Sequence, residues 1–191
     1  MTWSNSLDWD QLQPTWTHGA GGSGDDIQYI YNYGTKIYAN NGNNGPAMSG
    51  FVKGIARGQF KIQFKLGYAW GWSMFFMADQ SLVNPASPST SPAVAANTNG
   101  VRFMNNSSNN KLDIDKNVNG TVTRIRTGTG VSDSTLITLR RDSSNVVHIK
   151  VGSETSLTVG TFTNTFAFGC TLQSPSSVEL ITAINIDDGP S

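Results

Sequence analysis

The last third of the chain constrains the fold most strongly. Residues 134–151 contain two runs rich in Leu, Ile and Val, joined by the turn sequence Asp-Ser-Ser-Asn. An aromatic run at residues 161–169 ends in Gly, and residues 178–188 read as a closing strand. Because β-branched and aromatic residues fit pleated, half-buried strands, this order predicts one half of an antiparallel β-sandwich.

The middle of the chain carries the same signal. Phe60, Ile62, Phe64 and Leu66 occupy every second position with polar residues between them, which places one face on a core and one in water. Residues 67–78 are apolar on both faces and predict a central strand, and Asn119-Gly120 predicts a type I′ hairpin turn. Shorter strands are expected at residues 27–33, 35–39, 101–104, 111–118 and 121–126, with turns at 40–45 and 84–92.

Composition narrows the class of protein. The chain has 191 residues, the usual size of one domain, and only 14% are charged. The net charge is zero and Lys and Arg are scattered along the sequence, so we expect no nucleic-acid partner. The N-terminus has neither a basic start nor an apolar core, and no apolar run is long enough to cross a bilayer. We therefore expect no signal peptide, no membrane contact and assembly in a cytoplasm.

The N-terminal 26 residues differ from the rest. Trp3, Trp9 and Trp16 stand in a polar stretch that leads into a Gly-rich linker. Since Trp is costly to leave in water, this arm packs on something: either the edge of its own sandwich or a neighbouring subunit. We expect an arm and linker at residues 1–26 and a β-sandwich domain at residues 27–191.

These strands resemble a known family. The segment F-K-I-Q-F-K-L with the aromatic strand after it, then L-I-T-L-R-R-D-S-S-N-V-V-H-I-K-V, F-A-F-G and V-E-L-I-T-A-I-N-I-D-D, is similar to the concanavalin A-like (laminin G-like) jelly roll. The resemblance covers about residues 51–188. It implies an all-β, two-sheet antiparallel sandwich, a fold used by phage virion proteins, lectins and polysaccharide-degrading enzymes.

The sequence lacks the catalytic motifs that would identify an enzyme. Members of this family that hydrolyse polysaccharides carry an E-x-D-x-E strand, whereas Glu154 and Glu179 are the two glutamates of this chain and neither has a carboxylate two residues away. His18 lies in the linker, His148 alternates with apolar strand residues, and no G-x-S-x-G surrounds a serine. Cys170 is expected to be a buried apolar residue. We predict that the protein is not an enzyme.

One motif suggests a metal. Asp115, Asn117 and Asn119, followed by Gly120, fit the first half of a calcium loop, in which alternating side chains converge on the ion. The position where such a loop has a bidentate Glu is Arg126. The alternative is that Asn119-Gly120 is a plain hairpin turn and the Asp and Asn residues before it face solvent. We expect no cofactor, with weak calcium binding left open.

Three hypotheses for the function remain, and each implies a different partner. The first, which we favour, is a structural or interaction protein such as a phage capsid decoration or tail-fibre component: a homo-oligomer, or bound to other virion subunits through Trp3, Trp9 and Trp16. The second is a lectin-like module for cell-surface carbohydrate, with Tyr29, Tyr31, Tyr33 and Tyr38 as a stacking platform. The third is an enzyme of the same fold, which would need clustered acid and base residues that the sequence does not supply.

Overall fold

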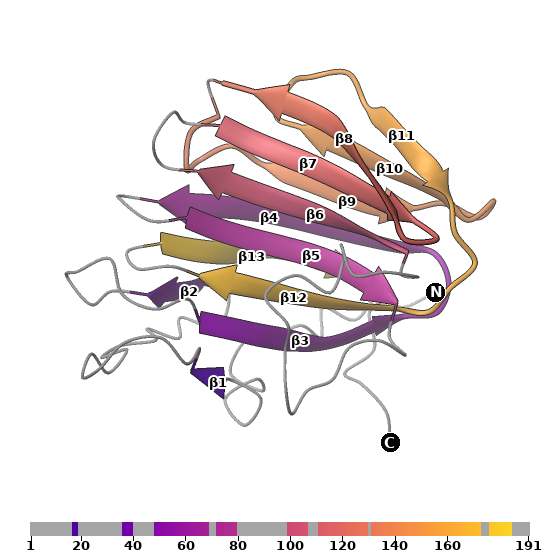
Figure 1. Ribbon diagram of the computed structural model, residues 1–191, viewed down its shortest axis with the longest axis horizontal. Helices are drawn as coiled ribbons and strands as arrows, with labels where there is room; N and C mark the ends of the chain where they lie inside the picture. Colours follow the sequence, from indigo (N-terminus) through magenta and orange to yellow (C-terminus); the bar gives the residue numbers. More distant parts are fainter. Residues whose placement is uncertain are drawn as a thin grey trace.

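The computed structural model describes residues 17–18, 36–39, 48–68, 72–79, 99–106, 111–129, 131–172 and 176–184, and in this part of the chain every regular element is a β-strand (Figure 1). The strands are β1 Thr17–His18, β2 Lys36–Ala39, β3 Met48–Ala56, β4 Phe60–Tyr68, β5 Trp72–Asp79, β6 Gly100–Asn106, β7 Lys111–Val118, β8 Thr121–Gly128, β9 Ile137–Arg141, β10 Val146–Val151, β11 Leu157–Thr161, β12 Phe166–Leu172 and β13 Ser176–Ile184. No helix among these residues is long and apolar enough to cross a bilayer.

The strands form two sheets packed face to face. The seven-stranded sheet has the order β1-β3-β12-β5-β6-β7-β8, and the six-stranded sheet has the order β11-β10-β9-β4-β13-β2. All pairings are antiparallel. In Figure 1 the seven-stranded sheet lies in front. This is the two-sheet sandwich that the sequence predicts.

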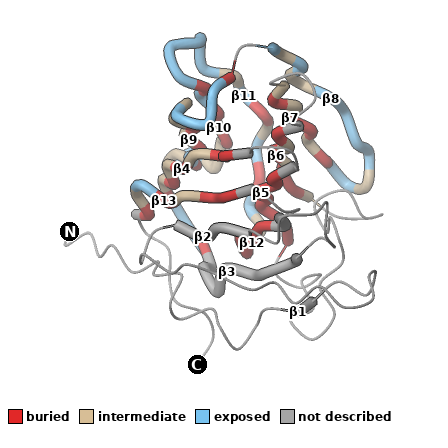
Figure 2. The backbone as a smooth tube through the Cα atoms, turned by 90° about the vertical axis from the view of Figure 1, so that its left-hand side faces the viewer, coloured by how far each residue is buried: buried red, intermediate tan, exposed pale blue. Residues whose placement is uncertain are grey.

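The core lies between the sheets and follows the alternation of the strands. In β4, Phe60, Ile62, Phe64 and Leu66 are buried, while the Lys and Gln residues between them are partly exposed. The Phe64 ring stacks on Phe75 of the opposite sheet at a centroid distance of 4.2 Å. Buried positions alternate with exposed ones along β9 and β10 as well (Figure 2).

The segment 51–66 is divided between the two sheets. Its first half lies in β3 of the seven-stranded sheet and its second half in β4 of the six-stranded sheet. The chain changes sheets at Arg57–Gln59, where a Cβ added to Gly58 would meet no other part of the protein within 4 Å. Strands β6, β7, β9, β10, β12 and β13 lie where strands are predicted, and β5 is central in its sheet as expected.

The turn predictions for two hairpins are confirmed. Asn119 and Gly120, between β7 and β8, both have positive φ, 51° and 84°, as a type I′ turn requires. Between β9 and β10, Asn145 has a φ of 61°, and the Asp142 carboxylate accepts hydrogen bonds from the N–H groups of Ser144 and Val146. The residues predicted as a strand at 27–33 and as turns at 40–45 and 84–92 lie outside the described part of the chain.

One buried arginine joins the connections between the sheets. Arg141, at the end of β9, is 2% exposed and donates hydrogen bonds to four backbone carbonyls. Those of Ala56 and Gly58 lie at the end of β3 and in the connection to β4, and those of Phe162 and Asn164 lie in the β11–β12 connection. Both connections carry the chain from one sheet to the other, so a single side chain satisfies carbonyls at two crossings.

Candidate functional site

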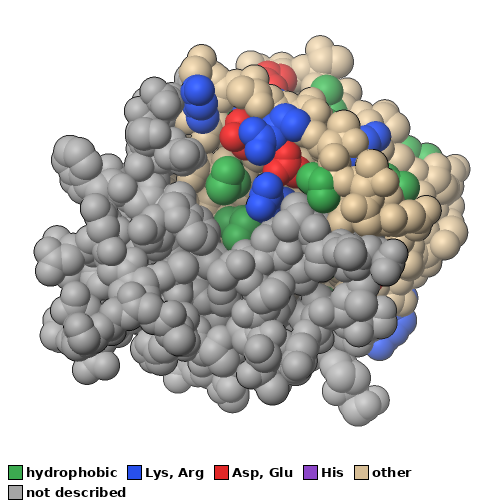
Figure 3. All heavy atoms as spheres, in the orientation of Figure 1, with side chains coloured by type: hydrophobic (Ala, Val, Ile, Leu, Met, Phe, Trp, Pro, Cys, Tyr) green, Lys and Arg blue, Asp and Glu red, His purple; other side chains and the backbone are tan. Residues whose placement is uncertain are grey.

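Two arginines and two aspartates meet on the outer face of the seven-stranded sheet. Arg102 of β6, Asp113 and Asp115 of β7, and Arg124 of β8 form this arginine–aspartate cluster. Register brings them together, because Asp115 lies opposite Arg102 on one side and opposite Arg124 on the other. Figure 3 shows acidic and basic side chains gathered over β6–β8.

Asp115 is the centre of the cluster. Its carboxylate accepts two hydrogen bonds from Arg102 and two from Arg124. Burial alone raises the pKa of the Asp115 carboxyl, but the hydrogen bonds from Arg124 and Arg102 outweigh it and hold the pKa below its ordinary value of 3.8. Asp115 is therefore ionised at neutral pH.

Arg124 is the member of the cluster that is most open to solvent. Its side chain is 44% exposed, whereas that of Asp115 is 4% exposed. The Arg124 Nη1 also donates to Asp113 Oδ2 at 2.7 Å. A guanidinium has five N–H donors, and these contacts use its Nε and one hydrogen on each terminal nitrogen. No described residue accepts from the other two N–H donors of Arg124, and two carboxylates fix the position of its guanidinium.

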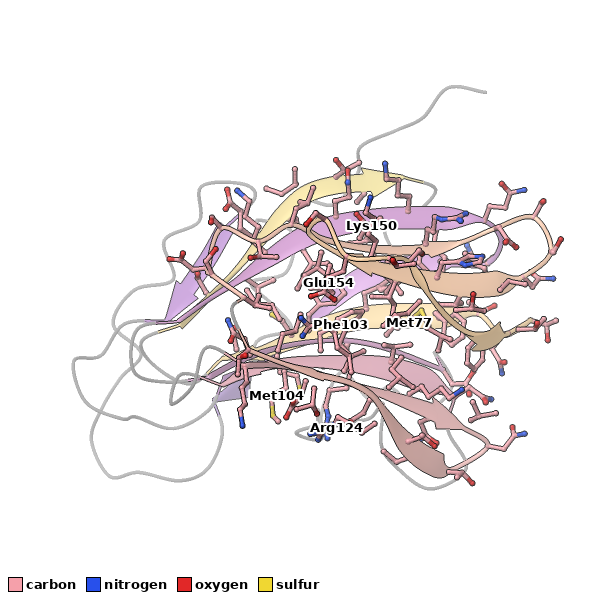
Figure 4. The ribbon with its side chains drawn as sticks, turned by 90° about the horizontal axis from the view of Figure 1, so that it is seen from above. Met77, Phe103, Met104, Arg124, Lys150 and Glu154 are labelled. Carbon is pink, nitrogen blue, oxygen red and sulfur yellow. The ribbon has the colours of Figure 1, made fainter. Side chains whose placement is uncertain are left out.

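The surroundings of the cluster are mixed in polarity. Met104 is half-buried and lies opposite Asp113, and Val122 of β8 is 44% exposed. Figure 4 shows Met104 and Arg124 on the outer side of their sheet, with Phe103 and Met77 between the sheets. The two arginines balance the two aspartates, so this face presents a neutral set of planar polar groups beside apolar side chains.

Two contacts tie the β7–β8 hairpin to the other sheet. Arg126 of β8 donates from Nε to Glu154 Oε2, in the turn after β10, at 2.9 Å, and its Nη1 donates to the Leu112 carbonyl within the hairpin at 2.6 Å. The Lys116 Nζ donates to the carbonyl of Val159 in β11 at 3.1 Å. The hydrogen bond from Arg126 lowers the pKa of Glu154. These contacts hold the strands that carry the cluster in place.

The residues of the predicted calcium motif are close in sequence but differ in environment. Asp115 and Asn117 lie two residues apart on one face of β7 and are both buried, whereas Asn119 is in the exposed turn, where its N–H donates to Asn99. The two arginines hold the Asp115 oxygens that a cation would use. Among the described residues no group of three or more His, Cys, Asp or Glu could hold a metal. Calcium at Asp115, Asn117 and Asn119 stays a prediction.

Of the aromatic candidates, the structure describes Tyr38. Trp3, Trp9, Trp16, Tyr29, Tyr31 and Tyr33 lie outside the described residues. Tyr38 belongs to β2, which pairs with β13 at the edge of the six-stranded sheet. Thr17 and His18 pair with Ser49 and Met48 of β3, so the chain just after Trp16 lies on the edge of its own seven-stranded sheet.

The remaining candidates have structural contacts. His148 is half-buried and its Nε2 lies 2.8 Å from Asp142 Oδ2, as expected for a strand histidine with a partner. Cys170 is fully buried, and burial raises the pKa of its thiol, which confirms the apolar interpretation. Glu154, in the turn after β10, pairs with Arg126 of β8, and Glu179 of β13 pairs with Lys65 of β4.

Arg102, Met104 and Arg124 were not predicted from the sequence as site residues. A signal for Arg124 was available, because a two-residue turn at Asn119-Gly120 fixes the hairpin register. Counting outward from Val118 and Thr121 places Asp115 opposite Arg124, as the structure has it. The position of Arg102 depends on the register between β6 and β7. The sequence between these two strands contains no short turn motif that would fix this register.

Comparison with known proteins supports the fold. No family model matches the chain, and no curated protein matches it. Among solved structures, a Bacillus subtilis protein of unknown function with a galectin-like fold matches with a TM-score of 0.55 at 10% identity, covering 97% of this chain and 99% of that one. The exoplasmic/lumenal domain of VIP36, solved with Ca²⁺ and Man3GlcNAc bound, matches with a TM-score of 0.52 at 11% identity, covering 100% of this chain and 92% of that one.

A native glycosidic hydrolase also matches, with a TM-score of 0.51 at 10% identity, covering 100% of this chain and 99% of that one. The chain thus has the concanavalin A-like jelly-roll fold. Since the matched structures include both a sugar-bound domain and a hydrolase, the fold alone does not decide between binding and catalysis.

Proposed function

We propose that the protein is a non-catalytic carbohydrate-binding module whose ligand is a neutral sugar, bound on the outer face of β6–β8. The observation that carries the proposal is the arginine–aspartate cluster. It holds the partly exposed Arg124 in a fixed position, with two N–H donors from which no described residue accepts a hydrogen bond. Sugar hydroxyls are recognised by planar polar groups of this kind.

The charge and polarity of the face support a neutral ligand. Arg102 and Arg124 are matched by Asp113 and Asp115, so a charged ligand would gain little from the site. Met104 and the exposed Val122 supply apolar area beside the polar groups, which suits the C–H surface of a pyranose ring. Because the carboxylates already hold Arg124 in place, ligand binding would cost little side-chain conformational entropy.

The experiment is titration calorimetry with neutral oligosaccharides of the glucose, mannose, galactose and N-acetylglucosamine series. We expect at least one series to bind, and Arg124→Gln to weaken that binding about tenfold or more, the usual loss for a hydrogen-bonding side chain at the centre of a site. Lys150→Gln, on the opposite sheet, is the control and should leave the affinity unchanged. If no series binds, or if Arg124→Gln binds as tightly as the wild type, the proposal fails.

We also propose, as a second candidate, that Trp3, Trp9 and Trp16 dock an N-terminal arm on another subunit, as in a phage virion component. The support is that Thr17 and His18 pair with the edge of β3, so the arm starts at a sheet edge where a further chain can be reached. Light scattering tests this second candidate: the full chain should have the mass of a discrete oligomer, and a variant lacking residues 1–16 should be a folded monomer. A monomeric full chain would contradict it.

A further inference from the structure

The outer face of the six-stranded sheet carries an excess of positive charge. Alternation along β4, β9 and β10 buries the apolar residues and leaves Lys61, Lys65, Arg140 and Lys150 on the outside, and these four side chains are the basic face. Glu179 of β13 is opposite Lys65 and pairs with it at 3.8 Å. Figure 4 shows Lys150 on the far side of the sandwich from Arg124.

Three members of the basic face are close together without a balancing carboxylate. Lys61 and Arg140 are directly opposite in register, and Lys150 is diagonal to Arg140 because it pairs with Thr138. Side chains in such positions have Cβ atoms about 5 Å apart when opposite and about 7–8 Å apart when diagonal. Within the described ranges no carboxylate lies within ion-pair distance of Lys61, Arg140 or Lys150.

This arrangement costs stability in the free protein. Like charges directly opposite in an antiparallel pair repel each other, and a neutral or acidic residue at either position would remove the repulsion. Asp142, the nearest acidic residue in sequence, is committed to His148 and to the β9–β10 turn. A ligand that brings negative charge would relieve the repulsion, so the basic face is better suited to the bound state than to the free one.

We propose that the basic face binds a sulfated polysaccharide. A sulfate ester has three terminal oxygens that accept hydrogen bonds, so one group can be shared by Lys61 and Arg140 from neighbouring strands while Lys150 reaches the next. Gln63 and Thr138 lie between these cations and hydrogen-bond to each other at 3.2 Å. They offer an amide and a hydroxyl to the sugar hydroxyls beside the sulfates.

The same features argue against a nucleic acid. Single-stranded binding relies on aromatic side chains that stack on bases, and the described outer-face residues of β4, β9 and β10 are Lys, Gln, Thr, Arg, Val and His. Duplex binding uses an extended stripe of cations along the phosphate backbone, whereas the basic face has four cations, one of which, Lys65, is paired with Glu179. A small group of cations on an otherwise neutral protein fits a polymer that is recognised through hydroxyls as well as charge.

The test is binding to dextran sulfate, with dextran and carboxymethyl dextran as polymers of the same backbone and a DNA duplex as the alternative polyanion. We expect dextran sulfate to bind most tightly, and substitutions on the basic face to leave any binding of neutral dextran unchanged. The triple variant Lys61→Gln, Arg140→Gln and Lys150→Gln should weaken binding about tenfold or more and make its salt dependence shallower, because fewer counterions are released. A melting temperature equal to or above that of the wild type would show that the triple variant is folded, because the substitutions remove the repulsion between Lys61 and Arg140.

Two control variants isolate the face. Lys65→Gln, at the paired position, should reduce binding less than any one of the three other substitutions. Arg124→Gln should leave it unchanged, which separates this proposal from the neutral-sugar site on the other sheet. Equal binding by the triple variant, equal or tighter binding of carboxymethyl dextran, or tighter binding of the duplex would each overturn the sulfated-polysaccharide proposal.

Discussion

Replacing Arg141 tests how the two sheets are joined. The guanidinium lies 5.5 Å from the Phe60 ring centroid and 5.4 Å from that of Phe166, and it donates to four carbonyls, with the shortest bonds to Gly58 at 2.7 Å and to Asn164 at 2.6 Å. Arg141→Met keeps a long apolar side chain but removes every donor. The variant therefore probes the hydrogen bonds and the charge more than the packing.

The expected loss can be estimated from these contacts. Hydrogen bonds to a charged group contribute about 1.5–3 kcal/mol each, so the two short ones alone amount to roughly 3–6 kcal/mol. Removing a buried guanidinium recovers part of its desolvation cost, which is also what lowers the pKa of Arg141. The carbonyls left behind lose their partner at a buried position. We expect a net loss of about 3–5 kcal/mol in the free energy of unfolding, which is the loss of these hydrogen bonds less the recovered desolvation cost.

Urea unfolding followed by Trp fluorescence measures this loss. With a slope of about 2 kcal/mol per molar urea, the midpoint should fall by roughly 2 M. The neighbouring residue supplies a matched control: Arg140 has the same chemistry but is exposed, so Arg140→Met should change the free energy of unfolding by less than about 0.5 kcal/mol. A loss below about 1 kcal/mol for Arg141→Met, or equal losses for the two variants, would refute the reasoning.

Three further predictions follow from the described contacts. Asp115→Asn should destabilise the protein by about 1–3 kcal/mol at pH 7. Since folding lowers the pKa of Asp115, its stabilisation is present above the ordinary value of 3.8 and is lost as pH falls through the lower folded pKa. The melting temperatures of the variant and the wild type, measured from pH 2 to 7, should therefore converge at the acid end. Gly169→Ala would place a Cβ 2.3 Å from the Phe76 ring and should cost about 1–3 kcal/mol in urea unfolding, whereas Gly160→Ala, with its nearest contact at 3.5 Å, should cost little. Cys170 should react with a thiol reagent at the rate of unfolding, because it is buried and burial raises its pKa; fast reaction in native buffer would contradict this.

The fold could be predicted from local patterns because the sequences of several strands and turns are distinctive on their own. Alternation in β4, the Asn119-Gly120 turn and the Asp-Ser-Ser-Asn turn each specify an element without help from distant residues. The change of sheet at Arg57–Gln59 was missed because both flanking segments, β3 and β4, are strands. Only Gly58 marks the break, and a single Gly in a strand pattern is equally compatible with a bulge.

The candidate site was harder to predict because it depends on register. Asp115 stood out in the sequence as a metal ligand, since an acidic residue with Asn at the next alternate positions matches a calcium loop. What decides its environment is which side chains lie opposite it, and those are Arg102 and Arg124. A motif gives residue types at fixed spacing, whereas strand pairing supplies the neighbours that neutralise them.

Basic residues that are scattered along the sequence can also lie together on the surface of the folded protein. Lys61, Arg140 and Lys150 are far apart in the chain, and with a net charge of zero they gave no sign of an electrostatic footprint. Pairing of β4 with β9 and of β9 with β10 brings them onto one face, while the acidic residues Asp113 and Asp115 are committed to arginines on the other sheet. Because each face has its own balance, one neutral and one basic, a protein without net charge can select an uncharged ligand on one side and an anionic ligand on the other.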